Sequence, residues 1–315
     1  MPTFSLPPAC VLRTITRINN TGRREVEDIL LREEAYDLIC NDKTVARMHC
    51  MPTHLEELAV GRLFTMGMLQ DACQITSLRI QHPLVQNART SKDPARATSD
   101  KDLPDRDVTS QVAAAHTIAA THAEKTTSVE DTACTATILQ HEQNLEGQNL
   151  EAQSLEKPRS AGSIWITTTS ELSTDNATEE AEVRLTAAQV HKLQAEFEER
   201  CVLFRQTGAA HSCALATEKG ILMFYEDIAR HNALDKLIGA MQLQAVSPQG
   251  KLMIFSGRLA VDMLEKAVVS GVRLLIAPGA PSLASVELAE TKQVSLLGFV
   301  RKDNINIYTC PHRIV

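Results

Sequence analysis

Between residues 213 and 309, short apolar segments alternate with helical segments, and this alternation constrains the fold of the chain more than any other feature. Apolar strands that alternate with helices indicate a partly parallel sheet covered on both faces. We therefore expect an α/β domain over residues 163–315. The strand-like runs are 213–217, 221–225, 252–255, 272–276, 294–300 and 305–309, and helical segments at 232–243, 258–270 and 282–291 separate several of them.

Residues 1–85 predict a smaller α+β subdomain. Two alternating runs, 35–40 and 44–48, flank the turn-forming residues Asn41 and Asp42 and indicate a β-hairpin. A helix is expected next, because Thr53 and Glu56 have the spacing of a capping box ahead of several leucines.

Residues 86–162 have a different composition. No aromatic residue occurs between Phe64 and Trp165, and Thr, Ser, Ala, Asp, Glu and Gln dominate. Such a composition cannot bury enough apolar surface to order a core, so a flexible polar insertion is expected. At 315 residues, the chain then has room for two domains besides this insertion.

The charge is unevenly distributed. Residues 1–200 hold 20 Lys and Arg against 30 Asp and Glu, whereas residues 201–315 hold 12 against 9. The net charge of −7 argues against a general nucleic-acid binder, which needs a basic surface. No run approaches the length of a membrane helix, and the N-terminus lacks the pattern of a signal peptide, so we expect a cytoplasmic protein.

The eight cysteines do not predict a metal site. They occupy positions 10, 40, 50, 73, 134, 201, 213 and 310, and no two are separated by only two residues. The paired spacing of zinc ribbons is therefore missing, and reduced thiols are expected in the cytoplasm.

Polar residues in the C-terminal half cluster after predicted strands. Ser256-Gly257-Arg258 and the turn 277–282 each lie between a strand and a helix, where exposed backbone N–H groups suit phosphate binding or serve as ordinary helix caps. An upstream helix should begin at a capping box formed by Thr186 and Gln189.

The segment 226–232 has two carboxylates, a guanidinium, an imidazole and an amide within seven residues. At the end of a buried strand, such side chains either line a site or form a solvated surface. In the second case, Asn232 caps the following helix, and Asp235 and Lys236 solvate it.

Two cysteines are candidate nucleophiles. Cys134 stands alone in the polar insertion, where an accessible thiol is free to react. Cys213 lies near His211, whose imidazole could activate it, although its place in a strand favours a buried structural role.

Together, these residues resemble a known family. Residues 226–236, Glu-Asp-Ile-Ala-Arg-His-Asn-Ala-Leu-Asp-Lys, are similar to the Glu-Asp-Val-Gly-Arg-His-Asn-Ala-Leu-Asp-Lys signature of the formate dehydrogenase accessory sulfurtransferases, the FdhD family. The matches cover most of the chain outside the insertion. Further similar segments follow in family order at 55–61, 207–211, 256–258, 286–289, 297–301 and 307–309.

The resemblance implies a sulfur carrier that takes persulfide sulfur from a cysteine desulfurase and passes it to the molybdenum cofactor, bis-molybdopterin guanine dinucleotide. The formate dehydrogenase catalytic subunit then receives the sulfurated cofactor. The implied fold is similar to the cytidine deaminase-like α/β sandwich without its zinc, and the chain lacks the zinc-ligand motifs of a deaminase. A homodimer is compatible with this assignment, whereas nucleic acid and membrane are not expected partners.

The implied site residues follow from the family pattern. Cys134 matches the first cysteine of the family's Cys-Gly-x-Cys-Gly loop, whereas Thr137 replaces the second cysteine and both glycines are lost. Ala229 also replaces a family glycine. Loss of sulfur transfer would leave a molybdenum-cofactor-binding chaperone, which is the alternative function. The implied cofactor-binding residues are Val300, Arg301, Lys302, Asp303, Asn304, Ile305, His211, Asp227, Arg230, His231 and Ser256.

Overall fold

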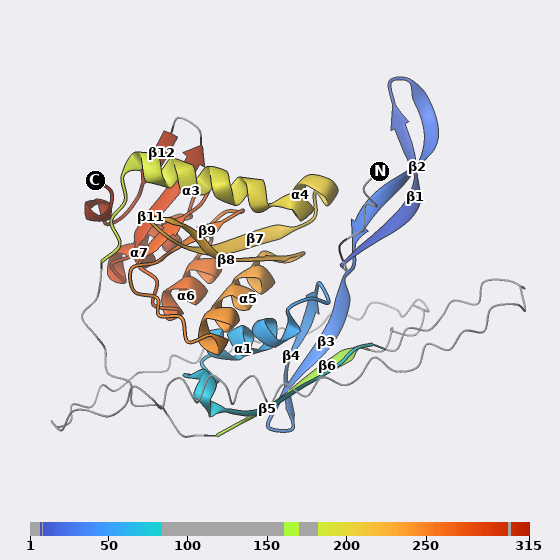
Figure 1. Ribbon diagram of the computed structural model, residues 1–315, viewed down its shortest axis with the longest axis horizontal. Helices are drawn as coiled ribbons and strands as arrows, with labels where there is room; N and C mark the ends of the chain where they lie inside the picture. Colours follow the sequence, from blue (N-terminus) through green and yellow to red (C-terminus); the bar gives the residue numbers. More distant parts are fainter. Residues whose placement is uncertain (1–6, 8, 84–160, 170–181, 302–303) are drawn as a thin grey trace, which may run out of the picture.

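The protein combines a six-stranded sheet, a four-stranded sheet and a two-stranded hairpin (Figure 1). The structure, a computed structural model, describes residues 7, 9–83, 161–169, 182–301 and 304–315. The predicted insertion 86–162, except for its last two residues, lies outside the described residues, and so does Cys134.

The larger sheet confirms the α/β class and the partly parallel arrangement predicted for the C-terminal half. Its strand order is β12-β11-β10-β9-β7-β8. Strands β9, β10 and β11 run parallel, whereas β12, β7 and β8 pair antiparallel with their neighbours. The strands are β7 (His211–Thr217), β8 (Gly220–Asp227), β9 (Leu252–Phe255), β10 (Leu274–Ile276), β11 (Ser295–Arg301) and β12 (Asn304–Ile307).

Helices cover both faces of this sheet (Figure 1). Because side chains alternate along a strand, Ala214 packs in the core beneath α3, whereas Leu215 packs in the core beneath α5 and α6. The predicted capping box is confirmed, since Thr186 caps α3 and Gln189 bonds back to it. The helices are α3 (Ala187–Arg200), α4 (Val202–Thr207), α5 (Arg230–Leu243), α6 (Val261–Val269) and α7 (Leu283–Thr291), and a 3₁₀ turn, η2 (Pro311–Arg313), lies near the C-terminus.

The smaller sheet has the order β4-β3-β6-β5 and contains the predicted hairpin. Asn41 and Asp42 form its turn with φ angles of 47° and 64°, which these side chains tolerate. The predicted boundary at residue 163 needs correction, because β6 joins this sheet by pairing with β3 and β5 rather than belonging to the C-terminal half. The strands are β3 (Glu34–Cys40), β4 (Lys43–Cys50), β5 (Ile75–Gln81) and β6 (Gly162–Thr168), with a 3₁₀ turn, η1 (Ala72–Gln74), before β5.

Helix α1 (Leu55–Thr65) joins the two halves by packing against α5. The predicted capping box at Thr53 is wrong, because the helix begins two residues later and His54 is its N-cap without a side-chain bond. The helices cross at two glycines: a Cβ on Gly61 would lie 1.8 Å from the Asp235 carbonyl oxygen, and one on Gly239 would lie 1.8 Å from that of Glu57. Only glycine allows this approach.

A hairpin of β1 (Cys10–Asn19) and β2 (Gly22–Leu31) projects from the body (Figure 1). At its base, Cys10, Ile29 and Leu31 pack with Leu203 of α4 and Met51. Among the described helices, none is long and apolar enough to cross a membrane.

Candidate functional site

Several of the predicted site residues lie at one edge of the six-stranded sheet, the edge formed by the carboxyl ends of the parallel strands β9, β10 and β11. His211 begins β7 and is paired in register with Asp227, the last residue of β8. Ser256 follows β9, donates its N–H to the Ser212 carbonyl at 3.0 Å and accepts the Ser212 N–H on its Oγ at 2.9 Å. In sheets of this kind, ligands bind outside the strand ends. The structure therefore brings His211, Ser256 and the start of α5 to one edge.

Asp227 is a fully buried carboxylate with all of its bonding positions in use. Its Oδ2 lies 2.6 Å from Lys236 Nζ and accepts the Met51 N–H at 3.2 Å. Its Oδ1 accepts from Asn232 Nδ2 at 3.0 Å and from the Ala229 N–H at 3.1 Å. Neither Asp227 nor Lys236 is exposed to solvent. Asp227 therefore holds the end of β4 and the start of α5 in place and presents no free oxygen to a ligand.

Two expectations about α5 are wrong. Asn232 does not cap the helix, since Ala229 is the N-cap and the Asn232 amide donates to the His49 carbonyl at 2.7 Å. Asp235 and Lys236 do not solvate the helix, because both are fully buried. Helix α5 lies between α1, α6 and the sheet (Figure 1), so protein covers the helix face that was predicted to be exposed to water.

Asp235 anchors a second buried ion-pair cluster. Lys266 Nζ lies 2.8 and 2.7 Å from its two oxygens, Thr65 Oγ1 donates at 2.9 Å, and Arg62 Nη1 lies 3.4 Å away. Arg62 and Thr65 belong to α1, whereas Lys266 belongs to α6. A buried charge needs such partners to offset its desolvation. The cluster therefore ties the smaller half of the molecule to the larger half.

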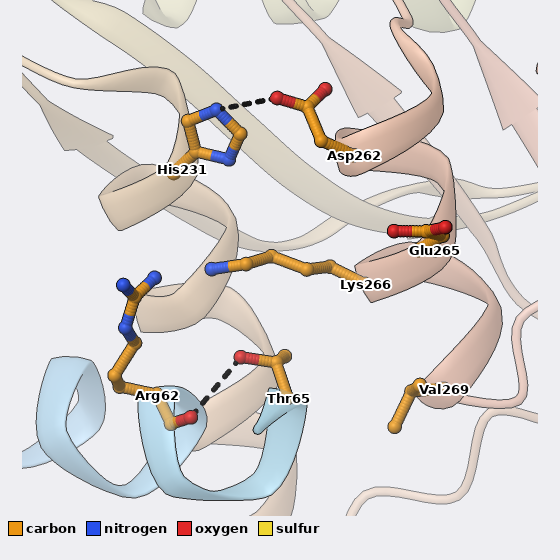
Figure 2. A pocket seen from close by; sticks show the side chains of 7 residues that line it. All are labelled: Arg62, Thr65, His231, Asp262, Glu265, Lys266 and Val269. Carbon is orange, nitrogen blue, oxygen red and sulfur yellow. Dashed lines mark hydrogen bonds and ion pairs between the residues drawn. The ribbon is translucent and has the colours of Figure 1, made fainter. Parts of the chain in front are cut away.

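Arg230 is exposed and His231 is half-buried, so these two side chains of the signature are accessible from solvent. Both reach Asp262 of α6. Arg230 Nη2 lies 3.4 Å from Asp262 Oδ2. His231 Nε2 lies 3.1 Å from the same oxygen (Figure 2). Burial lowers the pKa of His231, while Asp262 acts in the opposite direction. Burial also lowers the pKa of His211, and the charge of Arg230 lowers it further. Neutral imidazoles that can donate or accept a hydrogen bond are therefore favoured at this edge.

The predicted stretch 300–305 is only partly available to a ligand. Val300 is fully buried in the core beneath α3, whereas Arg301 and Asn304 are exposed and Ile305 is half-buried. The Arg301 guanidinium carbon lies 5.9 Å from the centre of the Phe299 ring. Lys302 and Asp303 lie outside the described residues.

An irregularity in β11 shapes this part of the edge. Phe299 has a φ of 50°, and the register between β11 and β12 shifts between Gly298 and Arg301. The Phe299 N–H donates to the Gly279 carbonyl at 3.3 Å. A Cβ on Gly298 would lie 2.8 Å from that carbonyl oxygen and 2.9 Å from the Tyr308 ring. The backbone after β10 thus lies directly against the bulge, and Arg301 is exposed at the end of the same strand.

The turn at 256–258 differs from the prediction. Helix α6 begins at Val261 and not at Arg258, where the helix was predicted to begin, so Ser256 does not cap it. Arg258 is exposed, and its Cγ would lie 3.0 Å from a Cβ on Gly279, which places it beside the second strand-end turn. The turn 277–282 agrees with its prediction, because Ser282 caps α7 by accepting the Ser285 N–H at 3.2 Å.

Seven cysteines lie among the described residues. Burial raises the pKa of the Cys10, Cys50, Cys201 and Cys213 thiols, to about 12 for Cys50. Cys213 is 1% exposed, which agrees with the structural role expected for it. Cys40 is also buried, and Cys73 and Cys310 are partly exposed. Within the described ranges, no group of three or more His, Cys, Asp or Glu side chains could hold a metal ion.

The sequence did not single out Arg62, Thr65, Asp262 or Lys266. None belongs to a local motif, and only the packing of α1 and α6 against α5 brings them together. The glycine at 61 was a usable signal, since a glycine within a helix is unfavourable unless packing requires it.

Helices cover both faces of the six-stranded sheet, and polar side chains lie at its strand ends. The buried Asp235 cluster joins this sheet to the smaller half of the molecule. This arrangement defines an α/β protein with its candidate site at the sheet edge. The chain belongs to the FdhD/NarQ family, whose model matches residues 31–161 and 118–315.

Similar proteins match either nearly the whole chain or a shorter part of it at higher identity. The sulfur carrier protein FdhD of Shouchella clausii is 28% identical over 302 residues, which is 96% of each chain. That of Bacillus subtilis is 41% identical over 111 residues, or 35% of this chain and 42% of the relative. A crystal structure from Desulfotalea psychrophila, described as a formate dehydrogenase accessory protein, matches 98% of this chain and all of that one with a TM-score of 0.65 and 20% identity. This last likeness concerns the fold.

Proposed function

We propose that this protein is a sulfur carrier that acts in the maturation of formate dehydrogenase. The observation that carries this proposal is the family match over residues 31–315. The names of the relatives support it, because the full-length match is to a sulfur carrier protein.

The proposed carrier thiol is Cys134. The thiolate is the attacking form of cysteine, so a carrier needs an accessible thiol that ionises readily. Burial works against this at Cys10, Cys50, Cys201 and Cys213, where it raises the pKa. Cys40 is buried as well.

The two partly exposed cysteines lie away from the candidate site. The carbonyl of Cys310 accepts from Ser295 Oγ at 2.6 Å, and Ser295 begins β11, so this thiol is at the sheet edge opposite Arg301. Cys73 lies in η1, before a strand of the smaller sheet. Cys134 thus remains the candidate that also matches the family's cysteine loop.

The loading step is a thiol–persulfide exchange. The Cys134 thiolate attacks the outer sulfur of a persulfide on a cysteine desulfurase, a new S–S bond forms on Cys134, and the desulfurase thiolate leaves as its S–S bond breaks. One thiolate suffices for this exchange, so the replacement of the second loop cysteine by Thr137 is compatible with transfer. The sulfur is then delivered to the molybdenum cofactor, which is the substrate of the carrier.

The sheet edge is the proposed binding site for the molybdenum cofactor. Bis-molybdopterin guanine dinucleotide carries pyrophosphate groups, and guanidinium groups bind phosphate through paired N–H donors. Arg230, Arg258 and Arg301 are all exposed at the ends of the strands or at the start of α5. The neutral imidazole of His211 lies on the same edge, with its Nδ1 3.8 Å from where a Cβ on Gly257 would lie.

Complementation tests the proposal in cells. A bacterial strain that lacks its own FdhD protein is supplied with the wild type, Cys134→Ala or the matched control Cys310→Ala, and formate dehydrogenase activity is measured. We expect rescue by the wild type and by Cys310→Ala, and none by Cys134→Ala at equal protein levels. Equal rescue by Cys134→Ala would instead support a cofactor-binding chaperone that has lost sulfur transfer.

Nucleotide binding tests the proposed cofactor-binding site at the sheet edge separately. Titration of the purified chain with GDP should give saturable binding that Arg301→Ala weakens by about tenfold, the loss expected for one charge-assisted contact to phosphate. Arg47→Ala, which removes an exposed arginine from the smaller sheet, is the matched control. Equal affinities for all three proteins would contradict the assignment of Arg301.

A further inference from the structure

A cavity of about 410 Å³ lies between α1, α5 and α6 and is a second candidate binding site (Figure 2). This volume falls in the range of small-molecule sites in proteins. His231 lies at its end nearest the sheet edge, and the rest of its wall comes from α1 and α6. The lining residues are Arg62, Thr65, His231, Asp262, Glu265, Lys266 and Val269.

The inner wall of the cavity, formed by Arg62 and Lys266 over the buried Asp235, has more positive than negative charge. Asp235 is fully buried and is shared by two cations, Lys266 at 2.7 Å and Arg62 at 3.4 Å. One carboxylate therefore faces two positive charges. Burial lowers the pKa of Lys266, because holding an ammonium group away from water disfavours its charged form.

Arg62 also has unused bonding capacity. Its Nε is buried and has no hydrogen-bond partner among the described residues, while Nη1 reaches Asp235. A buried donor without a partner is costly, and a bound acceptor would relieve that cost. Figure 2 shows the nitrogen-bearing ends of Arg62, Lys266 and His231 gathered on one side of the cavity.

Carboxylates lie on the other side of the cavity, along α6. Asp262 contacts the neutral His231 and is paired with the Arg230 guanidinium, which largely offsets its charge. Glu265 is exposed and adds a negative charge to the rim. A dianion would be repelled by this rim, whereas a monoanion matches the single surplus positive charge of the inner wall.

We propose that this cavity binds a small molecule through a carboxylate group, with Arg62 and Lys266 as the contacting donors. The planar fork of a guanidinium matches the two oxygens of a carboxylate. The cavity has room for more than the carboxylate itself, so this group anchors a larger solute. The inference does not depend on Cys134 or on the function proposed above.

Acetate is the probe for this site. Binding of ¹³C-labelled acetate to the full-length protein is followed by NMR line broadening, and we expect saturable binding. Lys266→Met should weaken it by about tenfold or more, because a charge-assisted hydrogen bond is lost. Glu265→Gln should strengthen it about twofold to threefold, because a repelling charge is removed. Glu287→Gln, the same change at an exposed position of α7, should have no effect.

Loss of folding must be separated from loss of binding. Lys266→Met removes a partner of a buried carboxylate, so its circular dichroism is compared with that of the wild type. Arg62→Lys provides a second variant, since it keeps the charge and loses the fork, and it should also weaken acetate. Absence of saturable acetate binding, equal binding by the wild type and folded Lys266→Met, or tighter binding of inorganic phosphate than of acetate would overturn the proposal.

Discussion

The crossing of α1 and α5 gives a sharp prediction for Gly61→Ala. An alanine Cβ at this position would lie 1.8 Å from the Asp235 carbonyl oxygen, 2.6 Å from its carbon and 2.8 Å from the Gly239 nitrogen. All three are backbone atoms of a helix, so they cannot rotate away as a side chain would. The helices would have to separate, which would also strain the ion pairs that Asp235 makes with Lys266 and Arg62.

The expected magnitude follows from two opposing effects. In an exposed helix, Gly→Ala stabilises by about 1 kcal/mol, whereas overpacking a tight contact costs about 3 kcal/mol or more. We therefore expect a net loss of about 2–4 kcal/mol in the free energy of unfolding and a fall in Tm of about 5–10 °C.

Urea unfolding followed by circular dichroism measures this change. Gly257→Ala is the matched control, because its nearest neighbour would be His211 Nδ1 at 3.8 Å, an ordinary contact. It should shift the unfolding free energy by less than about 1 kcal/mol. Equal stability of Gly61→Ala and Gly257→Ala would refute the close helix crossing.

Two further predictions concern buried charge. Lys236→Met should lower the free energy of unfolding in urea by about 3–5 kcal/mol, because it leaves Asp227 buried without its cation. Arg47→Ala, which breaks an exposed pair with Asp37, should lower it by less than about 1 kcal/mol. Similar losses for the two variants would contradict this contrast. Burial raises the pKa of Glu226 to about 7, so the folded state binds this proton more tightly than the unfolded state, and this contribution to stability is lost as pH rises from about 4.5 to 7. Thermal unfolding across that range should show a smaller loss for Glu226→Gln than for the wild type, and identical pH profiles would argue against it.

The sequence predicted what local patterns can encode. The apolar runs near 252–255 and 272–276 became neighbouring parallel strands, and Thr186 with Gln189 formed the expected cap. These features depend on residues that are close together along the chain.

Long-range packing set the rest. Strand β6 pairs with β3, more than a hundred residues earlier, so its place in the smaller sheet could not be inferred from its own pattern. Asp235 and Lys236 have the composition of a solvated helix face, yet α1 and the sheet cover them. The same packing divides the signature segment. Asp227, paired with the buried Lys236, accepts the Met51 N–H and so connects to the smaller half, whereas Arg230 and His231 are accessible enough to meet a ligand.

The central claim is that Cys134 carries sulfur as a persulfide. Mass spectrometry after incubation of the purified protein with a cysteine desulfurase and cysteine tests it most directly. We predict an added mass of about 32 Da, one sulfur atom, located on the peptide that contains Cys134 and absent from Cys134→Ala. An adduct on another cysteine, or one that persists in Cys134→Ala, would contradict the claim.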